Sequence, residues 1–446
     1  MNAWPWLDTR AAAAWEDFAT GREADCDRER FDKALRRPDW RTAYPPQVFT
    51  ADATSETVTA GVRLAELISG FPHRVFGEDL TAWTDYLDVP AEDAALMTQA
   101  LRQPRLRRAA TAFMRPDLVL THDGLKLVEL NVAASLGGLS TLAPYTAATR
   151  ASAYAAFLAR RGVVFDAPDT AKIWLDVFAG LTRARGEGPL RVFEATADPS
   201  DLDGGRRFFV DMLRTAGHHV SCGLVTDLDF TDAGVTHDGE PVDAVFTAYT
   251  WHETKQFVPP ALTRRLMEYD TAGLVDFIGS PAAALYDNKG NLALLHDPDH
   301  HHLLTAEERA LVARCVPTTF RLRPGTLERA LAHRDLLVCK PASAYGGKNL
   351  QFGSAMSDQE WRSLMRTRLA DPDERHVLQL RQHPATVHIP GAHPAEREVV
   401  LAPLVFGGTH AGVFLRQAPP RPRSAINASN GAEVAALLTV RNSRNA

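Results

Sequence analysis

Two short stretches, far apart in the chain, carry the side chains best suited to chemistry. The first is Arg115-Pro116-Asp117, which Glu129-Leu130-Asn131 follows after an apolar segment. Two carboxylates and an amide supply hard oxygen ligands, which magnesium prefers and completes with phosphate and water. We therefore predict that Asp117, Glu129 and Asn131 bind magnesium. Glu and Asn are also common on solvated hairpin faces, so the Glu-x-Asn pattern alone would be weak evidence.

The second stretch is an apolar segment that ends in Lys340-Pro341, and a glycine-rich turn follows it. Burying an ammonium group costs free energy unless the group is paired, and the phosphates of a nucleotide would be such a partner. Gly346, Gly347 and Lys348 could then wrap the phosphates with backbone N–H groups. The spacing is not that of a Walker loop. The alternatives are a lysine that reaches solvent and an ordinary hairpin turn.

Two further side chains become candidate nucleotide-binding residues when they are considered together with these two stretches. Lys289 lies in a helix that we predict to run from Asp287 to His296, and Gln379 lies on a predicted edge strand. Lys289 could add a second cation, and Gln379 could recognise the amino group of adenine. Taken alone, each would be an ordinary exposed residue. No HExxH motif or nucleophile elbow is present, and the acidic neighbours of Cys26 disfavour a thiolate nucleophile.

Strands are needed to position these side chains. Apolar segments at 118–120 and 125–130 flank His122-Asp123-Gly124, which predicts a β-hairpin. Because side chains alternate along a strand, Glu129 and Asn131 should share one face, with Asp117 within reach on the partner strand. Residues 1–112 look mainly helical. Residues 170–280 alternate between strand and helix without a GxGxxG motif, which predicts a mostly parallel sheet but no dinucleotide site.

Composition bounds the class of protein. The 446 residues are 45% hydrophobic and 23% charged, which is typical of a soluble globular chain with two or three packed units. The net charge of −6 argues against nucleic acid as the main partner. No apolar run approaches the roughly 20 residues that span a bilayer, and Met1 to Arg10 is not typical of a secretory signal. The cysteines are scattered, so we expect reduced thiols and a cytoplasmic location.

In their order along the chain, these motifs resemble those of the glutathionylspermidine synthase-like, circularly permuted ATP-grasp carboxylate–amine ligases. The resemblance covers about residues 115–380 and places the metal motif before the nucleotide lysines, whereas usual ATP-grasp chains have it after them. The matching segments are Arg115-Pro116-Asp117, Glu129-Leu130-Asn131, Asn288-Lys289, Lys340-Pro341, Gly346-Gly347-Lys348 and Gln379.

The resemblance implies an α/β (α+β) ATP-grasp fold in four segments. They are an N-terminal helical region at 1–112, a metal-binding hairpin segment at 113–165, a pre-ATP-grasp α/β domain at 166–282 and nucleotide-binding lobes at 283–446. It further implies that ATP and magnesium serve the joining of a small-molecule carboxylate to an amine through an acyl phosphate, with release of ADP and phosphate. Lys289, Lys340, the glycine turn and Gln379 would bind the nucleotide, and Arg115 would stabilise the transferred phosphoryl group. The alternatives are a small-molecule kinase and a non-catalytic nucleotide-binding protein.

The chain departs from the family directly after the Glu-x-Asn motif. Polyamine ligases of the family typically carry an acidic Asp-Thr-Pro run there, whereas residues 132–138 of this chain, VAASLGG, contain no acid. This difference argues against spermidine as the amine and against glutathione as the acid. Family members that also carry an amidase are longer, so the resemblance implies the ligase machinery alone.

Overall fold

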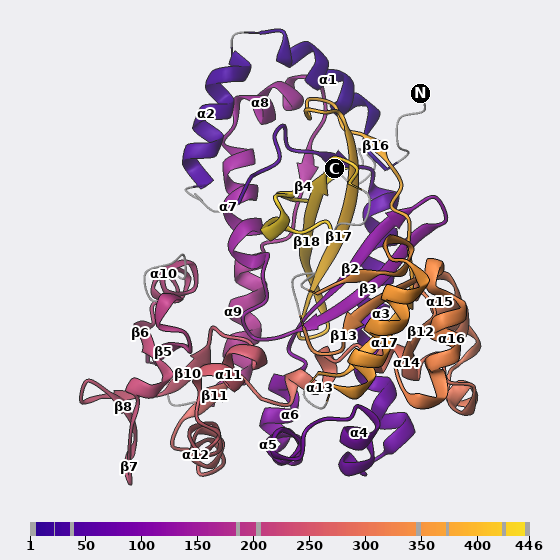
Figure 1. Cartoon of the computed structure of the whole chain (residues 1–446). Coiled ribbons are helices and arrows are strands. Elements are labelled where there is room, and N and C mark those ends of the chain that lie inside the picture. Colours follow the sequence, from indigo (N-terminus) through magenta and orange to yellow (C-terminus); the bar gives the residue numbers. More distant parts are fainter. Residues whose placement is uncertain are drawn as a thin grey trace.

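The computed structural model describes residues 6–21, 23–35, 40–183, 188–201, 207–344, 349–371, 374–421 and 425–441. Its centre is an antiparallel sheet in the order β19-β18-β17-β2-β3, with β16 paired to β17. Its strands are β2 (Phe113–Thr121), β3 (Gly124–Val132), β16 (Val387–His388), β17 (Glu396–Phe406), β18 (Thr409–Ala418) and β19 (Glu433–Ala436). The predicted hairpin is therefore confirmed as β2 and β3, and the last quarter of the chain extends its sheet (Figure 1).

Helix α3 (Ala51–Phe76) covers one face of this sheet. The approach is close, because a Cβ atom at Gly61 would lie 3.5 Å from Pro116 Cγ and closer still to β17. Glycine permits such an approach. Since Pro116 faces α3, its neighbours Arg115 and Asp117 point to the opposite face of the strand. That opposite face carries the candidate site.

Helices surround the central sheet. Some belong to residues 1–112, which were predicted to be mainly helical, and three follow the hairpin in the chain. They are α1 (Thr9–Ala19), α2 (Glu23–Leu35), α4 (Leu80–Tyr86), α5 (Ala91–Arg102), α6 (Pro104–Ala110), α7 (Leu139–Arg150), α8 (Ala153–Arg160) and α9 (Thr170–Leu181). A small sheet joins β1 (Val48–Phe49), β20 (Leu438–Val440) and β4 (Phe165–Asp166). It ties the described C-terminal residues to the first part of the chain.

A second sheet is wholly parallel, in the order β11-β10-β5-β6, as the alternation of strands and helices predicts. Its elements, with a three-stranded β-meander, are β5 (Arg191–Thr196), α10 (Arg207–Thr215), β6 (His219–Leu224), β7 (Asp229–Thr231), β8 (Gly234–His237), β9 (Glu240–Val242), β10 (Ala244–Thr247), α11 (Trp251–Phe257), α12 (Pro260–Thr271) and β11 (Asp276–Ile278). Arg105 of α6 and Arg183 bind the buried carboxylates of Asp270 and Asp276. These ion pairs fasten the parallel sheet to the helical region.

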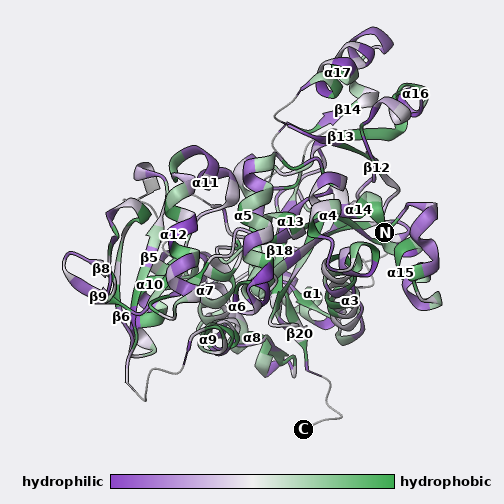
Figure 2. Cartoon of the chain, turned by 90° about the horizontal axis from the view of Figure 1, so that it is seen from below, coloured by the Kyte–Doolittle hydropathy of each residue, from purple (hydrophilic) through white to green (hydrophobic). Residues whose placement is uncertain are grey.

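A third unit projects from the body of the molecule (Figure 2). It has a sheet in the order β12-β15-β13-β14 and a small apolar core of its own. Its elements are β12 (Thr319–Arg321), α16 (Leu327–Ala332), β13 (Leu337–Pro341), β14 (Gln351–Phe352), α17 (Asp358–Ala370) and β15 (His376–Leu380). Strand β15 lies between β12 and β13, so the prediction that Gln379 sits on an edge strand is wrong. We call this unit the small lobe.

The helix predicted from Asp287 to His296 is interrupted. Helix α13 (Ala283–Asp287) ends before Asn288, whose backbone is extended, and α14 (Gly290–Leu294) begins after Lys289. The Lys289 N–H group donates to Ala342 O of the small lobe, at 2.9 Å, instead of continuing a helix. Helix α15 (Ala306–Cys315) follows and packs against α3 and β3. The break fixes the backbone of Lys289 against the small lobe.

None of the helices in the described part of the chain combines the length and the apolarity that crossing a bilayer requires. The four cysteines are free thiols, of which Cys26 and Cys222 are exposed and Cys315 and Cys339 are buried. Three consecutive histidines, at 300–302, lie in a 3₁₀ helix (Pro298–Leu303), and His301 and His302 are exposed.

Candidate active site

The hairpin brings its four polar side chains onto one face. Asp117 pairs directly with Glu129, and Arg115 pairs with Asn131 in the antiparallel ladder. The register shifts immediately beyond Asp117, where Leu118 pairs with Leu127 and Val128 becomes the extra residue of a β-bulge. Bulges are frequent beside functional sites because they re-aim side chains and free backbone groups. The freed Val128 carbonyl accepts a hydrogen bond from Lys340 of the small lobe.

Asp117 is a buried carboxylate held between two guanidinium groups. Arg115 Nε donates to Asp117 Oδ1 at 2.9 Å, and Arg416 Nη2 lies 2.6 Å from Asp117 Oδ2. Burial raises the pKa of Asp117, but the two arginines outweigh it and lower the pKa to about 2. The carboxylate therefore stays ionised at neutral pH. Arg416 belongs to β18 and was missed by the sequence reasoning, because only the β18-β17-β2 pairing brings it here.

The two arginines also share an aromatic neighbour. The guanidinium carbons of Arg115 and Arg416 lie 5.8 and 5.6 Å from the ring centroid of Phe414, within cation–π range. Arg115 Nη1 additionally donates to Gly137 O at 2.7 Å. Gly138 has a φ of 113°, and a Cβ atom there would lie 3.0 Å from Phe414. The loop after β3 is thus held against the two arginines.

Glu129 faces a buried cation. Lys289 Nζ lies 3.3 Å from Glu129 Oε2, and it also donates to Ala344 O. Ala344 is the last described residue before the predicted glycine turn, and Gly346, Gly347 and Lys348 lie outside the described residues. The break between α13 and α14 thus brings Lys289 to Ala344 of the small lobe and to Glu129 of the hairpin.

Lys340 is buried at the contact between the small lobe and the hairpin and does not reach solvent. Its Nζ donates to Gln379 Oε1 at 2.6 Å and to Val128 O at 3.1 Å. Burial and the positive charge of Lys289 lower the pKa of Lys340 to about 8, against the opposing effects of Glu129 and Asp117. Gln379 is itself buried, and its Nε2 donates to Thr319 Oγ1 at 3.1 Å. Gln379 therefore orients Lys340.

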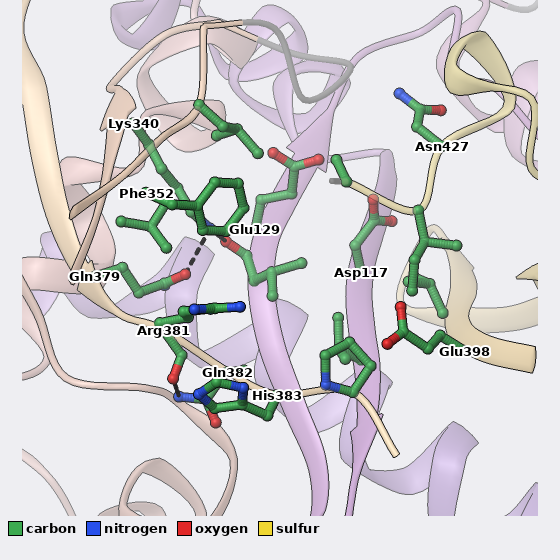
Figure 3. Close-up of a pocket in the computed structure, with 18 of the residues that line it drawn as sticks. Asp117, Glu129, Lys340, Phe352, Gln379, Arg381, Gln382, His383, Glu398 and Asn427 are labelled. Atoms are coloured by element: carbon green, nitrogen blue, oxygen red, sulfur yellow. Dashed lines mark hydrogen bonds between the residues drawn. The ribbon is translucent and has the colours of Figure 1, made fainter. Parts of the chain in front are cut away.

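A cavity of about 320 Å³ lies between the hairpin and the small lobe, and we call it the nucleotide cavity. Figure 3 shows Lys340, Phe352 and Gln379 on one side of it and Asp117, Glu398 and Asn427 on the other. Its polar lining includes Asp117, Glu129, Lys340 and Arg416, and its apolar walls come from Val338, Leu350, Phe352 and Val400. Apolar walls suit a planar base, and the positive charges of Lys340 and Arg416 suit phosphates.

A second cavity of about 470 Å³ lies on the other side of Glu129, towards the parallel sheet, and we call it the acceptor cavity. Glu129, Arg416 and Asn427 line both cavities, so the two meet at the hairpin. Asp287 at the end of α13 also lines the acceptor cavity and accepts a hydrogen bond from Val132 N at 3.0 Å. Burial raises the pKa of Asp287 to about 6, although Lys289 and the Val132 N–H group oppose this shift. The sequence reasoning did not single Asp287 out.

The hairpin residues fit a hard divalent cation only with help from a ligand. Across the described ranges, no group of three or more His, Cys, Asp and Glu side chains is arranged to hold a metal ion. Magnesium would therefore combine the carboxylates of Asp117 and Glu129 with the amide oxygen of Asn131, whose amide nitrogen already donates to Arg115 O. Carboxylate oxygens have two lone pairs each, so Asp117 could bind a metal while it stays paired with its arginines. Phosphate and water would complete the shell.

Comparison with known proteins gives a likeness of fold. No family model and no curated protein sequence matches the chain. A glutathione synthetase-like effector from Globodera pallida superposes over 93% of this chain and 96% of its own, with 13% identity and a TM-score of 0.54. A putative gamma-glutamylcysteine synthetase from Methylobacillus flagellatus covers 81% and 87%, with 12% identity and a TM-score of 0.44. The ATP-grasp ligase PsnB, complexed with a minimal precursor, covers 56% and 90%, with 15% identity and a TM-score of 0.31.

Of these structures, the glutathione synthetase-like effector is similar enough to indicate a shared fold. At its TM-score and coverage, the chain shares its overall fold with the glutathione synthetase-like effector. At 13% identity this likeness concerns the arrangement of the elements and not the chemistry of the site.

Proposed function

We propose that the protein is an ATP-dependent carboxylate–amine ligase with a circularly permuted ATP-grasp fold of the glutathionylspermidine synthase-like type. The observation that carries the proposal is the meeting of two cavities at one charged face of the β2–β3 hairpin. A transferable phosphoryl group needs cations on both sides, and this junction has Arg115 and Arg416 on one side and Lys289 and Lys340 on the other. The fold shared with a glutathione synthetase-like protein supports the same assignment.

The nucleotide cavity holds ATP in this proposal. The base lies between the apolar side chains of β13, β14 and β17, and the triphosphate extends towards Lys340 in the cavity lining and towards Lys289, which contacts the lining residue Glu129. Lys340 provides a desolvated positive charge, which is worth more inside a protein than in water. Gly346, Gly347 and Lys348, which lie outside the described residues, keep the role predicted from the sequence, which is to bind the phosphates. Asp117, Glu129 and Asn131 hold magnesium, which when bound neutralises charge on the β- and γ-phosphates.

The acceptor cavity holds the acid and then the amine. An oxygen of the substrate carboxylate attacks the γ-phosphorus, the bond from that phosphorus to ADP breaks, and an acyl phosphate forms. Arg115 and Arg416 stabilise the negative charge on the transferred group. The amine nitrogen then attacks the carbonyl carbon, phosphate leaves with the electrons of the C–O bond, and the amine loses a proton. Asp287 and Glu129 are the carboxylates that face this step from the cavity wall.

The four segments keep their proposed roles. Residues 1–112 frame the site, 113–165 carry the metal ligands, 166–282 form the pre-ATP-grasp α/β domain and 283–446 form the nucleotide-binding lobes. The sheet formed by β17, β18 and β19 with the hairpin supports the permuted order, because it sets residues 396–436 directly beside residues 113–132.

Trapping of the acyl phosphate tests the reaction. Hydroxylamine should convert it to a hydroxamate that requires ATP, magnesium and the correct acid, and oxygen-18 from the carboxylate should appear in the released phosphate. A kinase would leave the label in its substrate, and a non-catalytic protein would bind ATP without turnover. Arg115→Met should suppress the hydroxamate, whereas Arg28→Met on α2, where Arg28 pairs with Asp32 at the surface, should not. Label recovered in AMP would contradict attack at the γ-phosphate.

A further inference from the structure

The charges in the described lining of the acceptor cavity gather at one end. Arg115, Arg416, Glu129 and Asp287 lie there, beside the nucleotide cavity. The arginines are paired with Asp117, the Glu129 carboxylate with Lys289, and the Asp287 carboxylate accepts the Val132 N–H group. The two arginines share the single carboxylate of Asp117, so one positive charge of the pair remains for a substrate. One substrate carboxylate therefore satisfies the charged end.

The remainder of the described lining contains no Asp, Glu, Lys or Arg, and its one histidine, His252, is exposed. The loop after β3 contributes Val132 to Gly137 without an ionisable side chain, and the parallel sheet contributes hydroxyl and aromatic groups. The rings that line the cavity are those of Trp40, Tyr249, Trp251 and Phe414. Trp40 and Phe414 have ring centroids 6.1 Å apart at an interplanar angle of 31°. Such walls favour a ring-bearing ligand, because aromatic pairs add roughly 0.5–1.5 kcal/mol beyond area burial.

The position of Trp251 is fixed by its helix. Trp251 is the first residue of α11, and Thr250 and Glu253 form a capping box, in which Thr250 N donates to Glu253 Oε2 at 2.6 Å. A capping box satisfies two free N–H groups at the start of a helix. The Trp251 indole is therefore attached to the stabilised first turn of a helix and not to an irregular loop.

A polyionic substrate would meet this cavity at a cost. A second carboxylate placed against the rings would lose its hydration without gaining a cation among the described lining residues, which costs several kcal/mol. A polyamine would need several carboxylates, and the described lining offers only Asp287 beyond the paired Glu129. Residues 132–137 form part of the cavity wall, so the lack of an acid in this loop leaves the wall without a carboxylate for a polyamine.

We propose that the acid substrate is a monocarboxylic acid with an uncharged, ring-bearing body, whose carboxylate lies at Arg115 and Arg416 and whose ring packs against Trp251 and Tyr249. This inference rests on the proposed ligase function for its biological meaning. The binding preference itself can be measured without turnover.

Binding is tested with two probes of similar length, 3-phenylpropionate and glutarate, by calorimetry on the full chain with magnesium and a non-hydrolysable ATP analogue. The ring of the first probe stands where the second has its terminal CH2–CO2− group. We expect 3-phenylpropionate to bind at least tenfold more tightly than glutarate. Tighter binding of glutarate or of glutathione, or no binding of 3-phenylpropionate, would overturn the inference.

A matched pair of variants locates the ring. Trp251→Ala should weaken 3-phenylpropionate binding by about tenfold or more and leave affinity for the ATP analogue unchanged. Phe257→Ala, on the same helix but outside the described lining, should leave both affinities unchanged. Equal effects of the two substitutions would also overturn the inference. If 3-phenylpropionate binds with this dependence on Trp251 but no acid in a wide screen yields a hydroxamate, the specificity stands and the ligase proposal fails.

Discussion

The two cavities that meet at Glu129 are built in different ways. The nucleotide cavity is built mainly on strands, and its buried ionic groups Asp117, Arg416 and Lys340 have polar partners in the Arg115–Asp117–Arg416 and Lys340–Gln379–Thr319 networks. The acceptor cavity is made mainly from a loop, two short helices and strand ends, and aromatic and hydroxyl side chains line it. The nucleotide cavity holds charged groups at fixed positions, whereas the acceptor cavity is distinguished by the shape of its aromatic walls.

The two constructions suit two different tasks, positioning of a triphosphate and recognition of a substrate. Positioning a triphosphate needs donors held within a few tenths of an ångström, and strands cross-linked by buried ion pairs provide that rigidity. Recognition of a substrate can change with a few loop residues while the scaffold persists. We therefore expect substitutions in the nucleotide cavity to affect any reaction of this protein and substitutions in the acceptor cavity to affect particular substrates.

The largest effect should come from the residue shared by both cavities. Glu129→Gln keeps the shape but removes the charge that faces Lys289 and the proposed metal, so turnover should fall by about 100- to 1000-fold, and circular dichroism should show that the fold survives. Glu398→Gln is the matched control. Glu398 also lines the nucleotide cavity but is not a proposed metal ligand, so this variant should keep its turnover. Steady-state kinetics at saturating magnesium would decide. Near-normal turnover of Glu129→Gln would remove Glu129 from the site.

Asp117 should matter for folding as well as for function. Asp117→Asn leaves two buried guanidinium groups without their carboxylate, which typically costs about 3–5 kcal/mol in the free energy of unfolding. Asp276→Asn is the comparison, because Asp276 is equally buried and pairs with Arg183 far from the cavities. Denaturant unfolding should show a loss for both variants. Only Asp117→Asn should also abolish ATP turnover under conditions where each variant is folded.

The sequence predicted the elements whose signals are local. The Asp123-Gly124 turn and the alternation around Glu129 give the hairpin, and the alternation of strands and helices gives the parallel sheet. The pairing of β2 with β17 joins residues far apart in the chain, so no local pattern could reveal that Arg416 completes the Asp117 ion pair. An arginine in the middle of the apolar segment 411–418 was the available signal.

Two errors have related causes. Helical spacing suggested one helix through Lys289, but the Lys289 N–H group finds a better partner in Ala342 O across the lobe contact. Gln379 was expected on an edge strand, but β15 inserts between β12 and β13, and this insertion depends on tertiary pairing. In both places a contact with a distant segment overrides the local pattern, and in both it serves to position a lysine.

Removal of the buried lysine should weaken nucleotide binding without harming the fold. Lys340→Met keeps most of the side-chain volume and deletes a charge that is costly to bury, so stability should hold or rise. Affinity for an ATP analogue should fall by about 10- to 100-fold, the range for a charge-assisted hydrogen bond of roughly 1.5–3 kcal/mol. Lys172→Met on α9, which removes an exposed lysine paired with Asp176, should leave affinity unchanged. An unchanged affinity of Lys340→Met would place the phosphates elsewhere.

The smallest effect, and the one most specific to the nucleotide cavity, is a dependence on pH. The pKa of Lys340 is lowered to about 8 by burial, so the fraction of protonated Lys340 falls as the pH rises through that value. Phosphates bind the protonated form and should raise its pKa, so affinity for an ATP analogue should drop by about tenfold between pH 7 and pH 9. Binding above pH 8 should be accompanied by proton uptake, which calorimetry in buffers of different ionisation enthalpy measures. Lys340→Met should show neither the drop nor the uptake.

Binding of 3-phenylpropionate in the acceptor cavity should not share this profile, because guanidinium groups such as those of Arg115 and Arg416 do not titrate between pH 7 and pH 9. A drop that persists in Lys340→Met would assign the titration to another group and break the proposed contrast between the two cavities.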